Sequence, residues 1–182
     1  MISGRLCRPV TEVAIELVLK VRVGAGQTIY AGDIIDINGL DTVLTNNLEV
    51  FACNQPTTAR LGKQMAIVIN DGFETLADGR RPDGNANYTQ YSFAEGDVIT
   101  VILLREGSRF ELSYDSMTGT PTVGYSVFPV NGAFIPSTAT TVPAGTYSSL
   151  RTLALRNFRA GGLFGAQFMS TAVVIVQQPT LV

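Results

Sequence analysis

Short runs of aliphatic and β-branched residues recur along the chain, separated by turn-forming glycine, asparagine and proline. The most apolar run is 98–104, VITVILL, which has hydrophobic residues at both odd and even positions. Such a run predicts a strand buried on both faces, in the middle of a sheet or of a barrel wall. The next run, 110–114, alternates between apolar and polar residues, and a short Gly-containing turn separates the two runs. We therefore predict that 91–114 forms an antiparallel hairpin.

A second pattern covers 11–23, where every odd position from 13 onward is apolar. A helix would spread these side chains around its whole circumference, whereas a strand places them on one face. The pattern predicts one long, half-buried strand with a shared buried face: Val13, Ile15, Leu17, Leu19, Val21 and Val23. The preceding residues, 1–10, contain Gly4 and Pro9 and are predicted to form an N-terminal arm without regular structure.

Further strands are predicted at 34–37, 48–53, 65–69 and 172–176, and Asn38–Gly39 has the composition of a tight turn. Two turn-rich segments predict loops on the surface: 71–90 and 131–145. Residues 147–158 fit either a helical stripe or a strand. Read as a strand, Arg151, Leu153, Leu155 and Asn157 share a face, and the β neighbours favour this interpretation.

Many short strands, with no regularly alternating helices between them, predict an all-β fold. We expect an antiparallel β-barrel or β-sandwich with extended loops and terminal arms. A single β domain would cover 11–176, between the N-terminal arm at 1–10 and a C-terminal tail at 177–182.

Two stretches echo each other, at 30–37 and 91–99. Each has an aromatic residue, small residues, a Gly-Asp pair and then β-branched residues. Because Gly-Asp is a common way to enter a strand, we favour this explanation over an internal duplication. Asp33 and Asp97 are predicted to accept hydrogen bonds from the backbone of their own turns, rather than to act as a catalytic pair.

The low charge and high hydrophobic content of the chain limit the kinds of partner that it is expected to bind. Hydrophobic residues make up 46% of the chain and charged residues only 15%, with a net charge of −2. A surface this poor in charge is typical of a chain that is buried in an assembly or covered by neutral polar residues. Nucleic acid is disfavoured as a partner because phosphate binding needs clustered Lys and Arg. No apolar stretch is long enough for a membrane span, so no membrane partner is expected.

The residue types that usually perform catalysis are scarce. The chain has no histidine and only two lysines, and it lacks a recognisable nucleophile motif. Asp71, Asp78 and Asp83 do not have the spacing of a calcium loop. We therefore predict no catalytic residues, no metal site and no cofactor. Cys7 and Cys53 either form one disulfide or remain as buried thiols, and the expected reducing cytoplasm favours thiols.

One basic concentration stands out in a chain of low charge. Arg151, Arg156 and Arg159 either dock an acidic partner through bidentate pairs or form an ordinary solvated edge that discourages aggregation. Both interpretations stay open. Phe134 and Ile135, in the loop 131–145, are the other candidate partner contacts.

The openings IYAGDIIDINGLD and YSFAEGDVITVILLREGSRFELS, with the Thr/Ala/Pro-rich loop 131–145, resemble the capsid decoration (cement) proteins of tailed bacteriophages. The resemblance implies a β-rich virion protein, made in the host cytoplasm, on the outer surface of the head. It also implies that the protein bridges subunits of the major capsid protein, as a homotrimer, with no catalytic residue. The alternatives are another virion β-protein (tail tube, connector or fibre subunit) and a carbohydrate-binding β-sandwich module.

Overall fold

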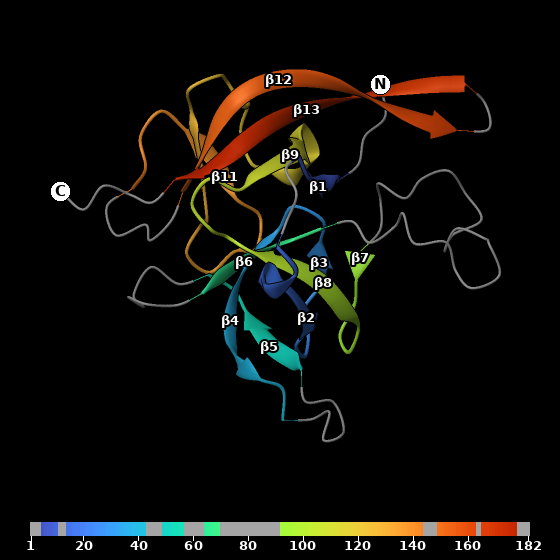
Figure 1. The fold of residues 1–182 in the computed structure, drawn as a ribbon, viewed down its shortest axis with the longest axis vertical. Coiled ribbons are helices and arrows are strands. Elements are labelled where there is room, and N and C mark those ends of the chain that lie inside the picture. The colour runs from blue at the N-terminus through green and yellow to red at the C-terminus, as the bar shows by residue number, and fades with distance from the viewer. Residues whose placement is uncertain are drawn as a thin grey trace.

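The chain folds into a small barrel with a larger sheet packed against one side of it (Figure 1). The computed structural model describes residues 5–10, 14–42, 49–56, 64–69, 92–143, 149–162 and 165–177. Within these ranges, the side chains of residues 15, 158–162 and 165–168 are not described.

The barrel is closed by five strands. In chain order they are β2 (Val18–Arg22), β4 (Ile34–Leu40), β5 (Val50–Asn54), β6 (Met65–Val68) and β8 (Val98–Leu103). Around the barrel the order is β2-β5-β4-β6-β8. Only the β2–β5 pair is parallel. Because the barrel closes on itself, each of its strands has a bonded neighbour on both sides.

The second layer is a six-stranded sheet with the order β1-β9-β13-β12-β10-β11. Its strands are β1 (Cys7–Pro9), β9 (Arg109–Ser113), β10 (Ser126–Phe128), β11 (Ser137–Ala139), β12 (Ser149–Gly162) and β13 (Gly165–Gln177). The long hairpin of β12 and β13 arches over the barrel in Figure 1. The remaining elements are a short pair, β3 (Ile29–Tyr30) with β7 (Ser92–Phe93), and the 3₁₀ turns η1 (Ile15–Leu17) and η3 (Tyr114–Ser116).

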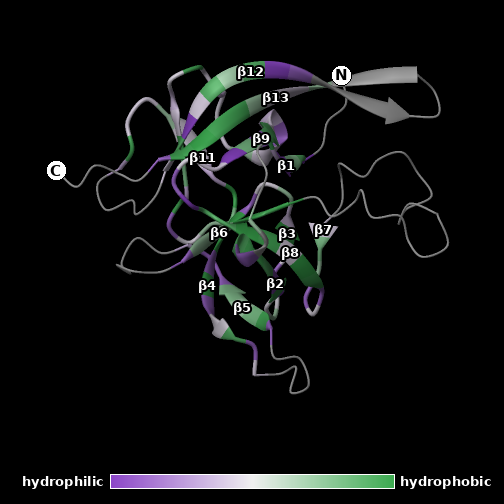
Figure 2. Cartoon of the chain, in the orientation of Figure 1, coloured by the Kyte–Doolittle hydropathy of each residue, from purple (hydrophilic) through white to green (hydrophobic). Residues whose placement is uncertain are grey.

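The barrel wall formed by β4, β6 and β8 separates two hydrophobic cores. Along β6, Met65 and Ile67 belong to the core between the barrel and the sheet, whereas Ala66 and Val68 belong to the barrel interior. Ile34 and Ile35 of β4 divide in the same way. Both faces of β6, and of 34–37 in β4 and 99–102 in β8, are therefore buried, which explains why these segments are mostly apolar. Figure 2 shows this wall mostly in the hydrophobic colour, with hydrophilic residues in the turns.

The predicted all-β fold class is confirmed, and the structure combines the two predicted architectures. One layer is a closed barrel, and its contact with the six-stranded sheet resembles the packing of a sandwich. The structure also has a strand at each of the predicted positions 34–37, 48–53, 65–69 and 172–176, although the bounds of the strands differ. The strand interpretation of 147–158 is confirmed by β12. The loop 71–90 lies outside the described residues.

The predicted hairpin of 91–114 is wrong in its pairing. Strand β8 is bonded to β2 and β6 in the barrel, whereas β9 is bonded to β1 and β13 in the sheet. The turn at 105–108 carries the chain from one layer to the other, and the amide of Gly107 donates to the carbonyl of Val176. A closed barrel leaves β8 no free edge, so β9 has to find its partners elsewhere.

The predicted single strand over 11–23 is also wrong. The amide of Leu17 donates to the carbonyl of Ala14 in the turn η1, and strand β2 begins only at Val18. The turn changes the direction of the side chains, so Leu17 packs against the core between the layers while Val21 lies inside the barrel. Residues 11–13 lie outside the described residues.

Asn38–Gly39 and Pro9, which were predicted to interrupt regular structure, both lie within strands. Asn38–Gly39 does not end its strand: both residues lie within β4, at a register shift between Ile37 and Leu40, and Gly39 has a φ of 102°. A bulge uses the same left-handed glycine that a tight turn would need. Pro9 does not exclude regular structure either, because β1 is an edge strand, where the missing amide costs nothing.

The loop 131–145 contains a short strand in its described part. Strand β11 pairs with β10, and the carbonyl of Phe134 accepts a hydrogen bond from the amide of Ile34 in the barrel. No helix among the described residues has the length and apolar character needed to cross a membrane.

The two Gly-Asp turns have the same local structure. Gly32 and Gly96 have φ angles of 88° and 89°, and β3 and β7, which precede them, pair with each other. Their surroundings differ. A Cβ atom on Gly32 would lie 2.5 Å from the Cβ of Ser116 in η3, whereas nothing lies within 4 Å of one on Gly96. Only glycine allows the first turn to approach η3 so closely.

This difference gives a matched test of the close approach. Both Gly32→Ala and Gly96→Ala should cost about 1 kcal/mol for the left-handed backbone. Gly32→Ala should lose roughly 1–3 kcal/mol more, because η3 has to move away. Urea unfolding of the two variants measures the difference. Equal losses would show that the turn and η3 are not in close contact.

Candidate functional site

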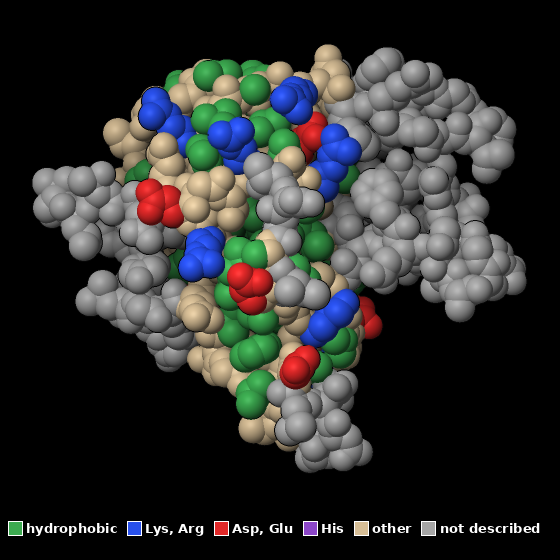
Figure 3. Space-filling model, in the orientation of Figure 1, with side chains coloured by type: hydrophobic (Ala, Val, Ile, Leu, Met, Phe, Trp, Pro, Cys, Tyr) green, Lys and Arg blue, Asp and Glu red, His purple; other side chains and the backbone are tan. Residues whose placement is uncertain are grey.

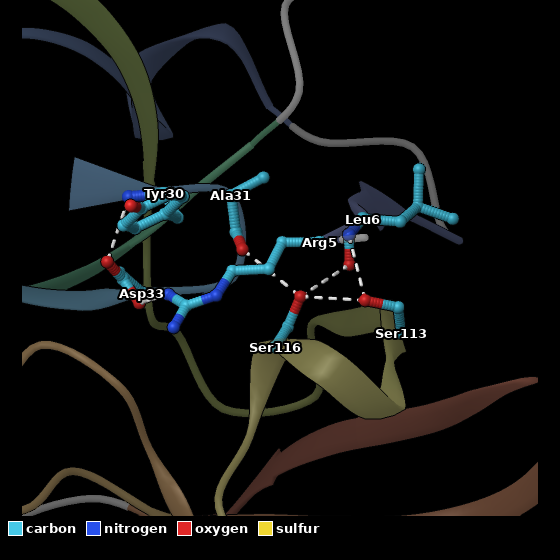
Figure 4. Close-up of polar contacts among 7 residues, drawn as sticks. All are labelled: Arg5, Leu6, Tyr30, Ala31, Asp33, Ser113 and Ser116. Atoms are coloured by element: carbon cyan, nitrogen blue, oxygen red, sulfur yellow. Dashed lines mark hydrogen bonds and ion pairs between the residues drawn. The ribbon is translucent and has the colours of Figure 1, made fainter. Parts of the chain in front are cut away.

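The hydroxyl groups of Ser113 and Ser116 lie at a buried polar junction between the two layers (Figure 4). The two oxygens are 2.9 Å apart, and Ser113 Oγ accepts from the amide of Leu6. Ser116 Oγ lies 3.1 Å from the carbonyl oxygen of Ala31 and 3.3 Å from that of Leu6, and it donates toward them. The partners come from the N-terminal segment, the β3–β4 turn, β9 and η3. The junction therefore ties four segments together.

Asp33 is the buried acid of this junction. Its Oδ1 lies 2.7 Å from Arg5 Nη1, and its Oδ2 accepts a 2.8 Å hydrogen bond from the amide of Tyr30. The guanidinium of Arg5 also lies 4.3 Å from the centre of the Tyr30 ring, within the range of a cation–π contact. Burial raises the pKa of Asp33 to about 6, although the Tyr30 amide and Arg5 oppose the shift.

The junction has the composition of a structural clamp. A serine nucleophile needs a base that accepts its proton. Ser113 and Ser116 instead bond to each other and to backbone groups, and Asp33 bonds to Arg5 and its own turn. The prediction that Asp33 and Asp97 cap their own turns is confirmed, since Asp97 Oδ2 accepts from the amide of Ala94 at 2.8 Å.

The two cysteines form no disulfide and both are buried, so the thiol interpretation is confirmed. Cys7 belongs to the core between the layers, and Cys53 belongs to the barrel interior. Burial raises the pKa of the Cys53 thiol to about 11 and that of Cys7 further still. Within the described ranges, no three His, Cys, Asp or Glu side chains form a group that could hold a metal ion.

A second buried acid, Glu111, joins three strands of the sheet. Arg8 of β1 donates to its Oε2 through Nε at 2.9 Å and Nη2 at 2.5 Å, and Thr171 of β13 donates to its Oε1 at 2.6 Å. Glu111 is 2% exposed. Its charge is therefore neutralised locally by Arg8.

The outer face of the six-stranded sheet, which points away from the barrel, carries exposed arginines. Arg109 and Arg151 lie opposite Ile175 from the two sides, and Arg156 lies opposite Thr171. Ile175 and Thr171 are four residues apart on β13, so all three arginines share its outer face. We call Arg109, Arg151 and Arg156 the arginine triad. All three are exposed, and none makes an ion pair with a described residue.

A β-bulge brings the triad together. Arg151 and Arg156 are five residues apart and would point to opposite faces of a regular strand. The register of β12 against β13 shifts between Thr152 and Ala154, which restores both arginines to one face. The predicted common face of Arg151, Leu153, Leu155 and Asn157 is therefore wrong. Figure 3 shows Lys and Arg side chains among hydrophobic ones over the region of this sheet.

The other predicted contact residues have different positions. Phe134 and Ile135 are half-buried, and Phe134 packs against the hydrophobic core of the barrel. Arg159 lies in β12, but its side chain is not described. Their role as partner contacts stays a prediction.

Arg109 was not among the partner-contact residues predicted from the sequence. It alternates with the buried Phe110, which marks it as an outward position, but its nearness to Arg151 follows only from the pairing of β9 and β12 with β13.

A carbohydrate site in a chain without tryptophan would depend on exposed tyrosines. Tyr30 lies against Arg5, and Tyr125 is half-buried with its backbone bonded to Thr152. Tyr88, Tyr91 and Tyr147 lie outside the described residues.

Comparisons of the chain with protein-family models, with curated proteins and with solved structures find no match.

The raised pKa of Asp33 predicts a pH dependence of stability. A carboxyl whose pKa rises from 3.8 to about 6 on folding stabilises the protein fully below pH 3.8. That contribution, at most about 3 kcal/mol, is lost as the pH rises through 6. The stability of the wild type relative to Asp33→Asn should therefore fall between pH 4 and 7.

Urea unfolding at several pH values measures this difference. Asp97→Asn, which removes the matching carboxylate from the second Gly-Asp turn, is the control. A difference between wild type and Asp33→Asn that stays constant from pH 4 to 7 would contradict the burial of an ionisable Asp33.

Proposed function

We propose that this chain is a structural protein of a tailed-phage virion. It decorates the outer surface of the head and stabilises the capsid by bridging subunits of the major capsid protein. The proposal combines the resemblance of 29–41 and 91–113 to capsid decoration proteins with the character of the sheet described above.

The observation that carries the proposal is the outer face of the six-stranded sheet. Its exposed arginine triad makes no ion pair within the described part of the chain, although charged residues are only 15% of the sequence. Three buried acids, by contrast, bond arginines of their own fold: Asp33 bonds Arg5, Glu111 bonds Arg8 and Asp41 bonds Arg22. Arginine is enriched at protein–protein interfaces, whereas lysine and the acidic residues are depleted there.

The polar groups of the junction support a structural role. Ser113, Ser116 and Asp33 hold the N-terminal segment, the barrel and the sheet together, and their hydrogen bonds are made within the fold. A protein that reinforces a shell benefits from such clamps, because load on one layer is passed to the other.

The described part of the N-terminal arm belongs to the fold. Leu6 and Cys7 are fully buried, and β1 is bonded to β9. Deleting residues 1–10 would therefore damage the sheet as well as any docking contact. Point variants on exposed positions are the sounder test of head binding.

A tail-tube subunit would add a strand to the sheet of its neighbour, and the long strand predicted over 11–23 would be the candidate for this role. Strand β2 has five residues, and both of its edges are bonded within the barrel, to β5 and β8. It has no edge left for augmentation, so it cannot play that role.

The proposal predicts binding to capsids and self-association. Purified empty heads of the phage that encodes the chain should carry it to the pellet on sedimentation, up to a fixed saturating ratio. Native mass spectrometry of the free protein should give the mass of a trimer. Heads already saturated with unlabelled protein are the control for specific sites. A monomer that stays in the supernatant at all head concentrations would contradict the proposal.

A further inference from the structure

We propose that the outer face of the six-stranded sheet is the docking surface, and that its arginine triad binds carboxylates on a partner protein. The inference rests on the proposed function and names the surface and the partner chemistry. It depends on the positions, the charge balance and the residue type of the triad.

The positions are set by strand pairing. Arg109 and Arg151 flank Ile175 on β9 and β12, so their backbones are two strand spacings, about 10 Å, apart. Arg156 lies four residues further along the ladder, a distance of about 13 Å. The triad thus covers a patch large enough to be the centre of a protein interface, on strands that are themselves rigidly paired.

The charge balance of the sheet is unlike that of the chain. The six strands contain five arginines, one glutamate and no lysine or aspartate, a net charge of +4 in a chain whose total is −2. Glu111 is buried and bonded to Arg8 and Thr171, so it offers no carboxylate to the triad. None of the described carboxylates is therefore paired with the triad.

The side-chain chemistry of arginine indicates which groups the triad binds. Arginine presents a planar fork that binds a carboxylate through two parallel hydrogen bonds, and it tolerates partial burial better than lysine. The half-buried Ile175 and Ala154 lie between the charges on the same face. Arginines set among apolar residues are typical of protein interfaces, whereas nucleic acid binding needs a denser basic surface. We therefore expect an acidic protein surface as the partner.

The test uses single and triple variants of the full chain. Arg109→Gln, Arg151→Gln and Arg156→Gln each remove one charge of the triad, and the triple variant removes all three. Arg105→Gln removes an equally exposed arginine from the turn before β9, so it is the control for net charge. The triple Arg→Lys variant keeps the charge and removes the fork. Thermal unfolding verifies that each variant is folded.

Two binding measurements are made, on empty heads and on poly-L-glutamate, each at several salt concentrations. We expect each single Gln variant to bind heads about three- to tenfold more weakly, and the triple variant about 30- to 1000-fold more weakly. The triple Lys variant should lie between the wild type and the triple Gln variant. Arg105→Gln should bind as the wild type does, and added salt should weaken the wild type more than the triple Gln variant.

The outcomes separate this inference from the proposed function. If the triple Gln variant binds heads as tightly as the wild type, the inference is wrong and the decoration of heads stands. If the wild type binds no heads, the proposed function fails, and loss of poly-L-glutamate binding in the triple variant still supports the docking surface. Equal binding of poly-L-glutamate by the wild type and the triple Gln variant would overturn the inference that the triad is a docking surface. Tighter binding of duplex DNA than of poly-L-glutamate through the same arginines would contradict the inference that the partner is a protein.

Discussion

The structure depends on one shared wall, formed by β4, β6 and β8, that is buried on both faces. Its side chains point alternately into the barrel and toward the six-stranded sheet, as Ala66 and Ile67 do. Each fully buried aliphatic side chain is worth roughly 1.5–3 kcal/mol, so the wall accounts for much of the driving force in both layers. Neither core can form without it, and the barrel and the sheet should therefore fold as one unit.

The closure of the barrel determines how the two layers are held together. Because the barrel offers no edge, the layers are joined by crossing segments and by buried polar contacts, such as those of Asp33 with Arg5 and Ser116 with Ala31. Asp41 bonds to Arg22 within the barrel layer. Asp33, Asp41 and Glu111 thus hold segments of the fold together, and none of them is bonded to the exposed arginines on the outer face of the sheet.

The sequence was enough to predict strands, because alternation and apolar runs report burial directly. It was not enough to predict pairing: VITVILL reads as half of a hairpin, and only closure of the barrel shows that β8 has no place for β9. The same limit applies to the candidate site. Arg151 and Arg156 were predicted as a set, but their common face results from a bulge at Thr152 that no residue type announces. Arg109 joins them only through β13, more than 50 residues further along the chain.

The central claim is that the outer sheet face with its arginine triad becomes an interface on the head. Chemical footprinting with an arginine-specific reagent such as phenylglyoxal, read by mass spectrometry with and without empty heads, tests it most directly. The account predicts that Arg109, Arg151 and Arg156 react in the free protein and are protected on the head, while Arg105 reacts in both. Protection of Arg105 with continued reaction of the triad would contradict it.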